Sequence, residues 1–151
     1  MNEDELRRLY EETSTIAVVG CSDDELKFGN YVFRYLQAQG YRIVPVNPHH
    51  SELLGERCYP SLKEVDVPVD TVDVFRPAEE APDIARDAVA IGAGYFWLQE
   101  GIVSEEAEEI AKDGGLGVVM DRCLGIVHGE LGLGPGVKAW LESPAPTPAD
   151  S

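Results

Sequence analysis

The segment 16-IAVVGCS-22 decides the fold. Its first four residues form a continuous apolar run, and three of them are β-branched. Such a run is typical of a strand that is buried on both faces, as in a parallel sheet covered by helices. The run ends in Gly20, and the pattern after Gly29 predicts a helix over residues 30–39 that stops at Gly40. The segment therefore predicts the strand–turn–helix unit with which α/β domains begin.

Four more apolar runs follow at regular intervals along the chain: 42-RIVPV-46, 71-TVDVF-75, 94-GYFWL-98 and 116-LGVVM-120. Helical patterns separate most of them, over residues 79–91 and after Ser104, which is a suitable N-cap. A further amphipathic helix is predicted over residues 3–12. Between the second and third runs the chain looks irregular, with at most a short helix near residues 61–65.

This alternation predicts an α/β fold, a single Rossmann-like, doubly wound parallel sheet of five strands with helices on both faces. Right-handed crossovers leave few topologies, and we predict the strand order 3-2-1-4-5. The switch point would then lie between strands one and four, and ligands bind at such points, outside the carboxyl ends of the strands. Residues 1–142 are expected to form this domain, and residues 143–151 a disordered, Pro-rich tail.

The net charge and the cysteine content argue against several classes of protein. The 151 residues include 28 acidic and 12 basic side chains, a net charge of −16, which argues against general affinity for nucleic acid or anionic membranes. No apolar stretch is long enough to span a membrane, and the acidic N-terminus does not resemble a signal peptide. Cys21, Cys58 and Cys123 are scattered and form no CxxC pair, so we expect a cytoplasmic protein without a disulfide framework. The three histidines lack zinc-type spacing, and no metal is expected.

The turn Gly20-Cys21-Ser22 is the strongest candidate for a binding site. A glycine-rich turn that leads into a helix can hold phosphate, because free backbone N–H groups and the positive end of the helix dipole face the ligand. Gly20 would allow the backbone to approach the ligand, and Ser22 could donate a hydroxyl hydrogen bond. The same residues are also common in plain strand–helix turns, since such short glycine motifs recur by chance.

The end of the second strand indicates which nucleotide fits. A NAD-binding domain usually carries an acid there, about 20 residues beyond the glycines, which binds the ribose diol. Here the strand ends 44-VPVNPHH-50, without an acid, and the Gly-Lys-Ser/Thr ending of a Walker A motif is also absent. A ligand whose ribose already carries a 3′-phosphate needs no carboxylate at this point. An NAD(P)-dependent oxidoreductase or another nucleotide-binding enzyme on the same fold stays open as an alternative.

Six motifs, in order and with their spacing, carry a family resemblance: IAVVGCS, GYRIVPVNP, LLGERCYPSL, VDVFRPAE, YFWLQEGI and VVMDRC. Over roughly residues 10–128 the chain resembles the stand-alone CoA-binding domain family, and it is similar to the CoA-binding part of the succinyl-CoA synthetase α subunit. The resemblance implies that the ligand is coenzyme A or an acyl-CoA. The implied contacts are Gly20, Cys21, Ser22 and Lys27 around the pyrophosphate, Val44, Pro45 and Asn47 around adenine and ribose, Phe75 and Arg76 at the pocket border, and Gln99 and Gly101 below the pantetheine arm.

The ligand is strongly anionic, and the acids 23-DDE-25 lie beside the proposed site. Basic residues close to the site must therefore offset these acids. Distant exposed charges are screened beyond about 8–10 Å at physiological salt. Lys27, Arg76 and Arg122 all follow strand ends, and we expect them to converge on one edge of the sheet.

We see no Ser–His–Asp arrangement, paired-carboxylate motif or redox dithiol, so we expect a small-molecule binding protein rather than an enzyme. The synthetase's phosphohistidine domain is not found in this chain, so ligase chemistry is not expected. A thiol-redox protein is an alternative, because a position near a helix N-terminus can lower the pKa of the Cys21 thiol. A homodimer is expected only from the general frequency of such assemblies.

Overall fold

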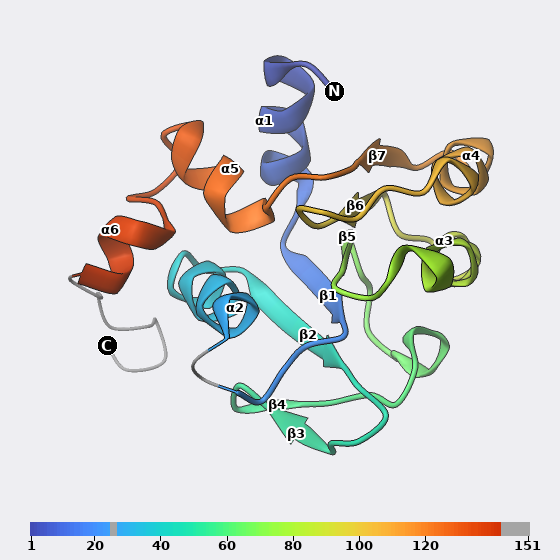
Figure 1. The fold of residues 1–151 in the computed structure, drawn as a ribbon, viewed down its shortest axis with the longest axis horizontal. Coiled ribbons are helices and arrows are strands. Elements are labelled where there is room, and N and C mark those ends of the chain that lie inside the picture. Colours follow the sequence, from blue (N-terminus) through green and yellow to red (C-terminus); the bar gives the residue numbers. More distant parts are fainter. Residues whose placement is uncertain (25–26, 143–151) are drawn as a thin grey trace.

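The five apolar runs form the central sheet in a computed structural model that describes residues 1–24 and 27–142 (Figure 1). Glu25 and the predicted tail 143–151 lie outside the described residues. All five strands of this sheet are parallel: β1 (Thr15–Val19), β2 (Arg42–Val46), β5 (Thr71–Val74), β6 (Tyr95–Leu98) and β7 (Gly117–Val119). Every residue of β5 is buried, as expected of a strand with helices on both sides.

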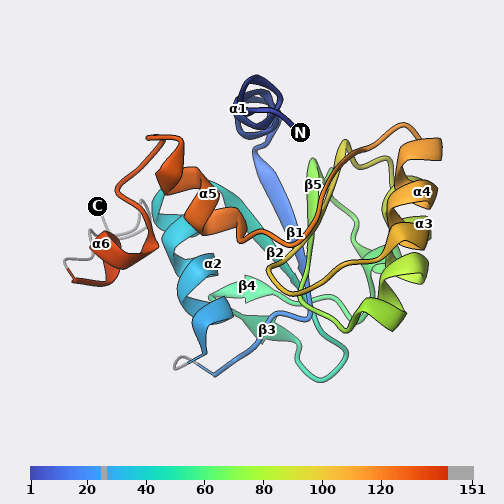
Figure 2. The ribbon, with the colours of Figure 1, turned by 45° about the horizontal axis from the view of Figure 1, so that its top comes forward.

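Helices cover both faces of the sheet, which confirms the predicted fold class (Figure 2). One face carries α2 (Phe28–Ala38), α5 (Leu124–Glu130) and α6 (Val137–Glu142), and α1 (Glu3–Glu12) adds to the same hydrophobic core. The other face carries α3 (Ala81–Ala90) and α4 (Glu105–Asp113). Within the described residues, no helix combines the length and the apolar composition that crossing a membrane requires.

The helix predictions hold where the sequence carries clear end signals. α1 has the predicted bounds, and α4 begins after Ser104, whose hydroxyl oxygen accepts a hydrogen bond from the Ala107 N–H at 3.1 Å. α2 begins earlier than predicted, and the predicted helix 79–91 divides into a 3-10 turn η2 (Ala78–Glu80) and α3. The link between β2 and β5 holds a small hairpin of β3 (Glu52–Leu53) and β4 (Glu56–Arg57), and then a 3-10 turn η1 (Leu62–Glu64). α5 and α6 have no counterpart in the sequence prediction.

The predicted strand order 3-2-1-4-5 is wrong. The sheet has the order β2-β1-β5-β6-β7, so the third strand of the sheet pairs with the first strand and not with the second. The outer edge of β2 is occupied by the link itself: the Tyr59 N–H donates to Pro45 O at 3.0 Å, and the Asn47 N–H donates to Tyr59 O at 2.9 Å. β5 pairs on the far side of β1, so the switch point lies between β1 and β5.

Candidate functional site

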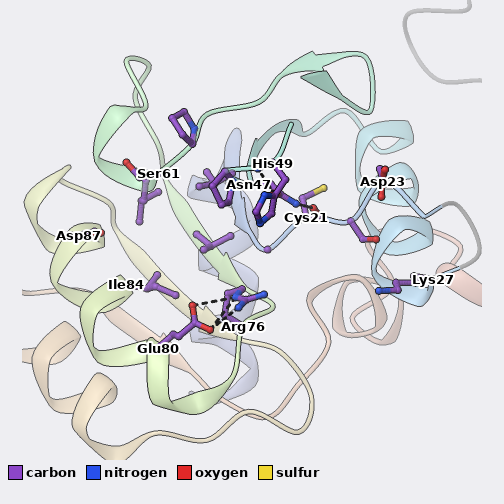
Figure 3. A pocket seen from close by; sticks show the side chains of 17 residues that line it. Cys21, Asp23, Lys27, Asn47, His49, Ser61, Arg76, Glu80, Ile84 and Asp87 are labelled. Atoms are coloured by element: carbon purple, nitrogen blue, oxygen red, sulfur yellow. Dashed lines mark hydrogen bonds and ion pairs between the residues drawn. The ribbon is translucent and has the colours of Figure 1, made fainter. Parts of the chain in front are cut away.

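A cavity of about 450 Å³ opens at this switch point, outside the carboxyl ends of β1, β2 and β5 (Figure 3). The turn after β1 and the residues after β2 form one side, and the link 60–62 and α3 form the other. Its lining consists of Val19, Gly20, Cys21, Ser22, Asp23, Lys27, Val46, Asn47, Pro48, His49, Pro60, Ser61, Leu62, Arg76, Glu80, Ile84 and Asp87.

The turn of residues 20–22, which we call the phosphate turn, requires glycine at its first position. Gly20 has a φ of +91°, a conformation that L side chains rarely adopt. A Cβ added there would lie 2.7 Å from Phe75 O and 2.8 Å from Arg76 Cδ. The side-chain stem of Arg76 therefore packs directly against the turn, and only glycine leaves room for it.

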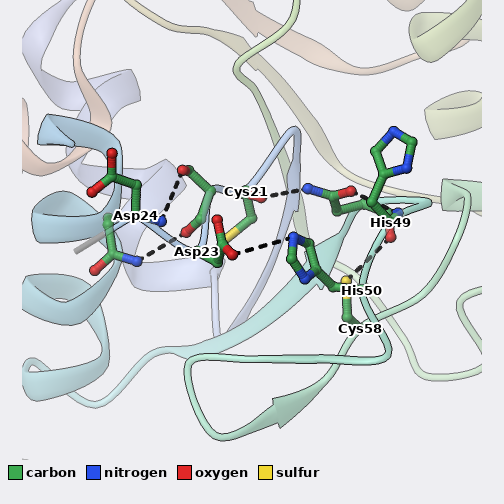
Figure 4. A network of polar contacts seen from close by, with 9 residues as sticks. Cys21, Asp23, Asp24, His49, His50 and Cys58 are labelled. Atoms are coloured by element: carbon green, nitrogen blue, oxygen red, sulfur yellow. Dashed lines mark hydrogen bonds and ion pairs between the residues drawn. The ribbon is translucent and has the colours of Figure 1, made fainter. Parts of the chain in front are cut away.

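Two asparagines fix the backbone of this loop, whose residues Cys21, Asp23 and Asp24 are labelled in Figure 4. Asn47, after β2, donates its side-chain N–H to Cys21 O at 2.9 Å, and Asn30, in α2, donates to Ser22 O at 2.9 Å. The Ser22 hydroxyl oxygen accepts a hydrogen bond from the Asp24 N–H at 3.1 Å, so its own proton can still be donated to a ligand. Asn47 thus acts by positioning the turn as well as by bordering the cavity.

Each carboxylate that borders the cavity has a basic neighbour. Glu80 accepts hydrogen bonds from Arg76, with 2.7 Å between Nη2 and Oε2 and 3.2 Å from Nε to both carboxylate oxygens. Asp23 lies 3.6 Å from His50 Nε2, and Asp87 lies 3.5 Å from Lys63 Nζ. Lys27, at the start of α2, forms no salt bridge with residues 1–24 and 27–142.

Burial opposes activation of the Cys21 thiol, which the thiol-redox alternative from the sequence would require. Its side chain is buried, and this burial raises its pKa to about 12, with a smaller contribution from Cys58. Because the thiolate is the reactive form, Cys21 is unreactive at neutral pH.

A second cavity of about 360 Å³ adjoins the first along the same edge, where β5, β6 and β7 end. Arg76 borders both cavities. The second lining consists of Phe75, Arg76, Pro77, Gln99, Glu100, Ile102 and Cys123.

Most residues singled out from the sequence border one of the two cavities. The first holds Gly20, Cys21, Ser22, Lys27, Asn47 and Arg76, and the second holds Phe75, Arg76 and Gln99. Val44 and Pro45 are buried within β2, and Val44 packs in the core. Gly101 donates its N–H to the Asp121 carboxylate at 2.6 Å and borders neither cavity.

The expected convergence of three basic residues is only partly found. Lys27 and Arg76 both border the first cavity. Arg122 instead lies 3.8 Å from Glu130 of α5, and it borders neither cavity. The helix α5, which the sequence analysis did not predict, supplies this competing carboxylate.

The sequence analysis also missed Asp73, a carboxylic acid in the middle of β5. It is fully buried, and its Oδ2 accepts a hydrogen bond from Gln99 Nε2 at 3.1 Å. Its Oδ1 has no partner among the described residues. Loss of water raises the pKa of this carboxyl well above its usual value, so the group favours its neutral form. An acid inside an otherwise apolar strand, 71-TVDV-74, was the signal that could have found it.

The fold is a doubly wound α/β domain with a cavity at its switch point, the place where such sheets generally bind ligands. Residues 14–129 match the family model described as CoA binding domain, and the chain belongs to this family. The resemblance inferred from the six motifs is thereby confirmed.

Stand-alone proteins and ligase domains both match the chain. It is 40% identical over 124 residues to the uncharacterized protein YneT of Bacillus subtilis, which covers 82% of this chain and 92% of that protein. A solved structure from Thermus thermophilus has 44% identity and a TM-score of 0.82, and the match covers 87% of this chain and 99% of that one. The ADP-forming acetate–CoA ligase I of Archaeoglobus fulgidus is 30% identical over 128 residues, which are 78% of this chain but only 19% of the ligase. The chain thus spans about a fifth of that enzyme.

Proposed function

We propose that this protein binds coenzyme A, as the free thiol or as a thioester, in the cavity at the switch point between β1 and β5. The observation that carries the proposal is the pairing of the phosphate turn with a β2 end that lacks an acid. The chain leaves β2 through Asn47, Pro48 and His49, all of which border the cavity. A dinucleotide site would need a carboxylate there for the ribose diol, whereas a ribose 3′-phosphate is repelled by one.

Charge at the cavity supports an anionic ligand. α2 begins beside the phosphate turn and has no acidic residue in its first turn, so its N-terminal N–H groups favour a phosphate. Lys27 and Arg76 add two cationic groups that can form charge-assisted hydrogen bonds. Asp87 is paired with Lys63, which reduces its repulsion of a phosphate.

Binding, rather than catalysis, is the activity that these residues support. Among the described residues that line the cavity, Cys21 is the thiol, and burial keeps it protonated. The relation to acetate–CoA ligase extends over a fifth of that enzyme, and the ligase reaction is not assigned to this chain. Three cysteines without disulfides suit a reducing compartment, and we place the protein in the cytoplasm.

Calorimetric titration tests the proposal. We expect CoA to bind, 3′-dephospho-CoA to bind more weakly because it lacks the ribose phosphate, and NAD to bind most weakly. Tighter binding of NAD than of CoA would overturn the proposal and favour the oxidoreductase alternative.

A further inference from the structure

One carboxylate at the first cavity has a partner whose charge depends on pH. Among the described residues that line this cavity, the carboxylates are Asp23, Glu80 and Asp87. Glu80 pairs with an arginine and Asp87 with a lysine, and these side chains stay charged throughout the physiological range. Asp23 instead pairs with His50, which carries a positive charge only when its imidazole is protonated. The charge beside the phosphate turn therefore depends on the proton occupancy of one histidine.

The contact between Asp23 and His50 joins the loop after β1 to the loop after β2 (Figure 4). Asp23 Oδ2 lies 3.6 Å from His50 Nε2, and the side chains are 63% and 31% exposed. Asn47 holds the same two loops together: its side chain donates to Cys21 O at 2.9 Å, and its backbone oxygen accepts the His50 N–H at 3.5 Å. Hydrogen bonds to the backbone thus place the imidazole beside the carboxylate without the help of the ion pair.

The other titratable groups around His50 cannot replace it as the partner of Asp23. Asp24, in the loop after β1, adds a second carboxylate to the network (Figure 4). Cys21 and Cys58 contribute buried thiols, which are uncharged because burial raises the pKa of both. Within residues 1–24 and 27–142, the salt bridges of Asp23 involve no side chain other than His50.

We propose that His50 regulates the affinity of the first cavity for its anionic ligand: the protonated imidazole neutralises Asp23 beside the phosphate turn, and the ligand then binds more tightly. This inference rests on the proposed function, since the ligand is CoA. Histidine is the side chain that ordinarily changes charge between about pH 5 and 8, so the affinity for CoA falls as pH rises through this range. By linkage, bound CoA favours the protonated imidazole, and binding takes up protons. His50 does not border the cavity, so it acts on the ligand through Asp23.

Titration calorimetry with CoA at about pH 6 and about pH 8 tests the inference on the full chain. The four proteins are the wild type, His50→Asn, Asp23→Asn and the double variant, since asparagine is polar but cannot be charged. His50→Asn should weaken CoA binding roughly two- to fivefold at the lower pH, the effect of one exposed ion pair, and change it little at the higher pH. Asp23→Asn should bind CoA more tightly than the wild type at the higher pH, by a similar factor. In the double variant, the loss caused by His50→Asn should disappear.

Two controls separate the imidazole from other sources of pH dependence. The 3′-phosphate of CoA also titrates near pH 6, but the ligand is the same in all four proteins, so its contribution cancels in the comparison. Proton uptake on binding, measured from the heats in buffers of different ionisation enthalpy, should be larger in the wild type than in His50→Asn. His49 borders the cavity next to His50, and adding His50→Asn to His49→Asn should still weaken binding at the lower pH.

The outcomes separate this inference from the proposed function. If His50→Asn changes CoA binding equally at both pH values, or not at all, the switch is wrong and the CoA site stands. If the loss caused by His50→Asn is as large in the Asp23→Asn background, the imidazole does not act through Asp23, and the inference is again wrong. If CoA binds none of the four proteins while their thermal unfolding shows that they are folded, the proposed function fails and this inference fails with it.

Discussion

Glu80 competes with the ligand for Arg76, and removing its charge should tighten CoA binding. The guanidinium forms three short contacts with the Glu80 carboxylate, and both side chains are nearly half exposed, at 46% and 47%. Exposed ion pairs contribute about 0.2–1 kcal/mol, and the two-pronged geometry here favours the upper end. Glu80→Gln should therefore raise the affinity for CoA roughly 1.4- to 5-fold.

The free energy of the Arg76–Glu80 pair also enters the loss of CoA affinity that we expect for Arg76→Ala. A charge-assisted hydrogen bond to phosphate contributes about 1.5–3 kcal/mol, from which the lost Glu80 pair must be subtracted. The net loss is about 0.5–2.8 kcal/mol, or roughly 2- to 100-fold in Kd. Titration calorimetry of both single variants and of Arg76→Ala/Glu80→Gln completes a double-mutant cycle. In the double variant, the gain from Glu80→Gln should disappear, apart from a small general effect of charge.

Two results would refute this reasoning. Weaker CoA binding by Glu80→Gln would mean that the carboxylate orients Arg76 for the ligand instead of competing for it. An unchanged Kd in Arg76→Ala would mean that Arg76 does not contact the ligand at all. Thermal unfolding of each variant serves as the control, since loss of an exposed ion pair should change the free energy of unfolding by less than about 1 kcal/mol.

Three further predictions concern the turn, the charge at the start of α2 and a buried histidine. Gly20→Ala should lower the free energy of unfolding by about 2–5 kcal/mol, because of the positive φ and the clash with backbone. Gly40 has a φ of +101° but lies in open space, so Gly40→Ala should cost only about 1–2 kcal/mol. Equal shifts in Tm for the two variants would contradict the packing at the turn. Lys27→Ala should weaken CoA binding about tenfold, while Lys112→Ala, whose side chain pairs with Glu108 on α4, should leave Kd unchanged in the same titration. Burial lowers the pKa of His128 below its unfolded value, so the folded state binds fewer protons and the free energy of unfolding should fall as pH drops from about 6.5 toward the folded pKa. Urea unfolding of wild type and His128→Asn across this range should show that the fall is smaller in the variant, and parallel curves would exclude His128 as its source.

The strands and the phosphate turn could be predicted because their signals are local. Five continuous apolar runs became five strands, and Ser104 became an N-cap because its side chain bonds within its own helix turn. Gly20 could be singled out because it ends the first apolar run, and its φ of +91° is one that L side chains rarely adopt. Each of these features depends on residues that are close together in the sequence.

Strand order was not predictable, because it depends on contacts between distant segments. Tyr59 occupies the outer edge of β2 through backbone hydrogen bonds, which its side-chain identity does not reveal. The same link supplies residues 60–62 to the cavity wall. Both right-handed topologies satisfy the apolar pattern, so the pattern alone does not distinguish them.

The helix α5 was missed because Gly125 and Gly129 interrupt its apolar pattern, and α6 was missed because it has only six residues. Gly129, in α5, packs so closely on Gly136, just before α6, that a Cβ on Gly129 would lie 2.5 Å from the Gly136 Cα. A pair of glycines that permits close backbone packing looks like loop sequence when it is examined alone. The position of Arg122 was missed for the same reason, since its partner Glu130 lies on α5.

The central claim is that CoA binds across the carboxyl ends of β1, β2 and β5, and amide NMR tests it most directly. In a titration of ¹⁵N-labelled protein with CoA, the amide signals of Gly20, Ser22 and Lys27 should shift together and saturate at one Kd. Those of Gly40 and Gly115, in turns that precede β2 and β7 at the opposite edge of the sheet, should stay in place. Shifts that are confined to Gly40 and Gly115, or no shift at all at millimolar CoA, would contradict the account.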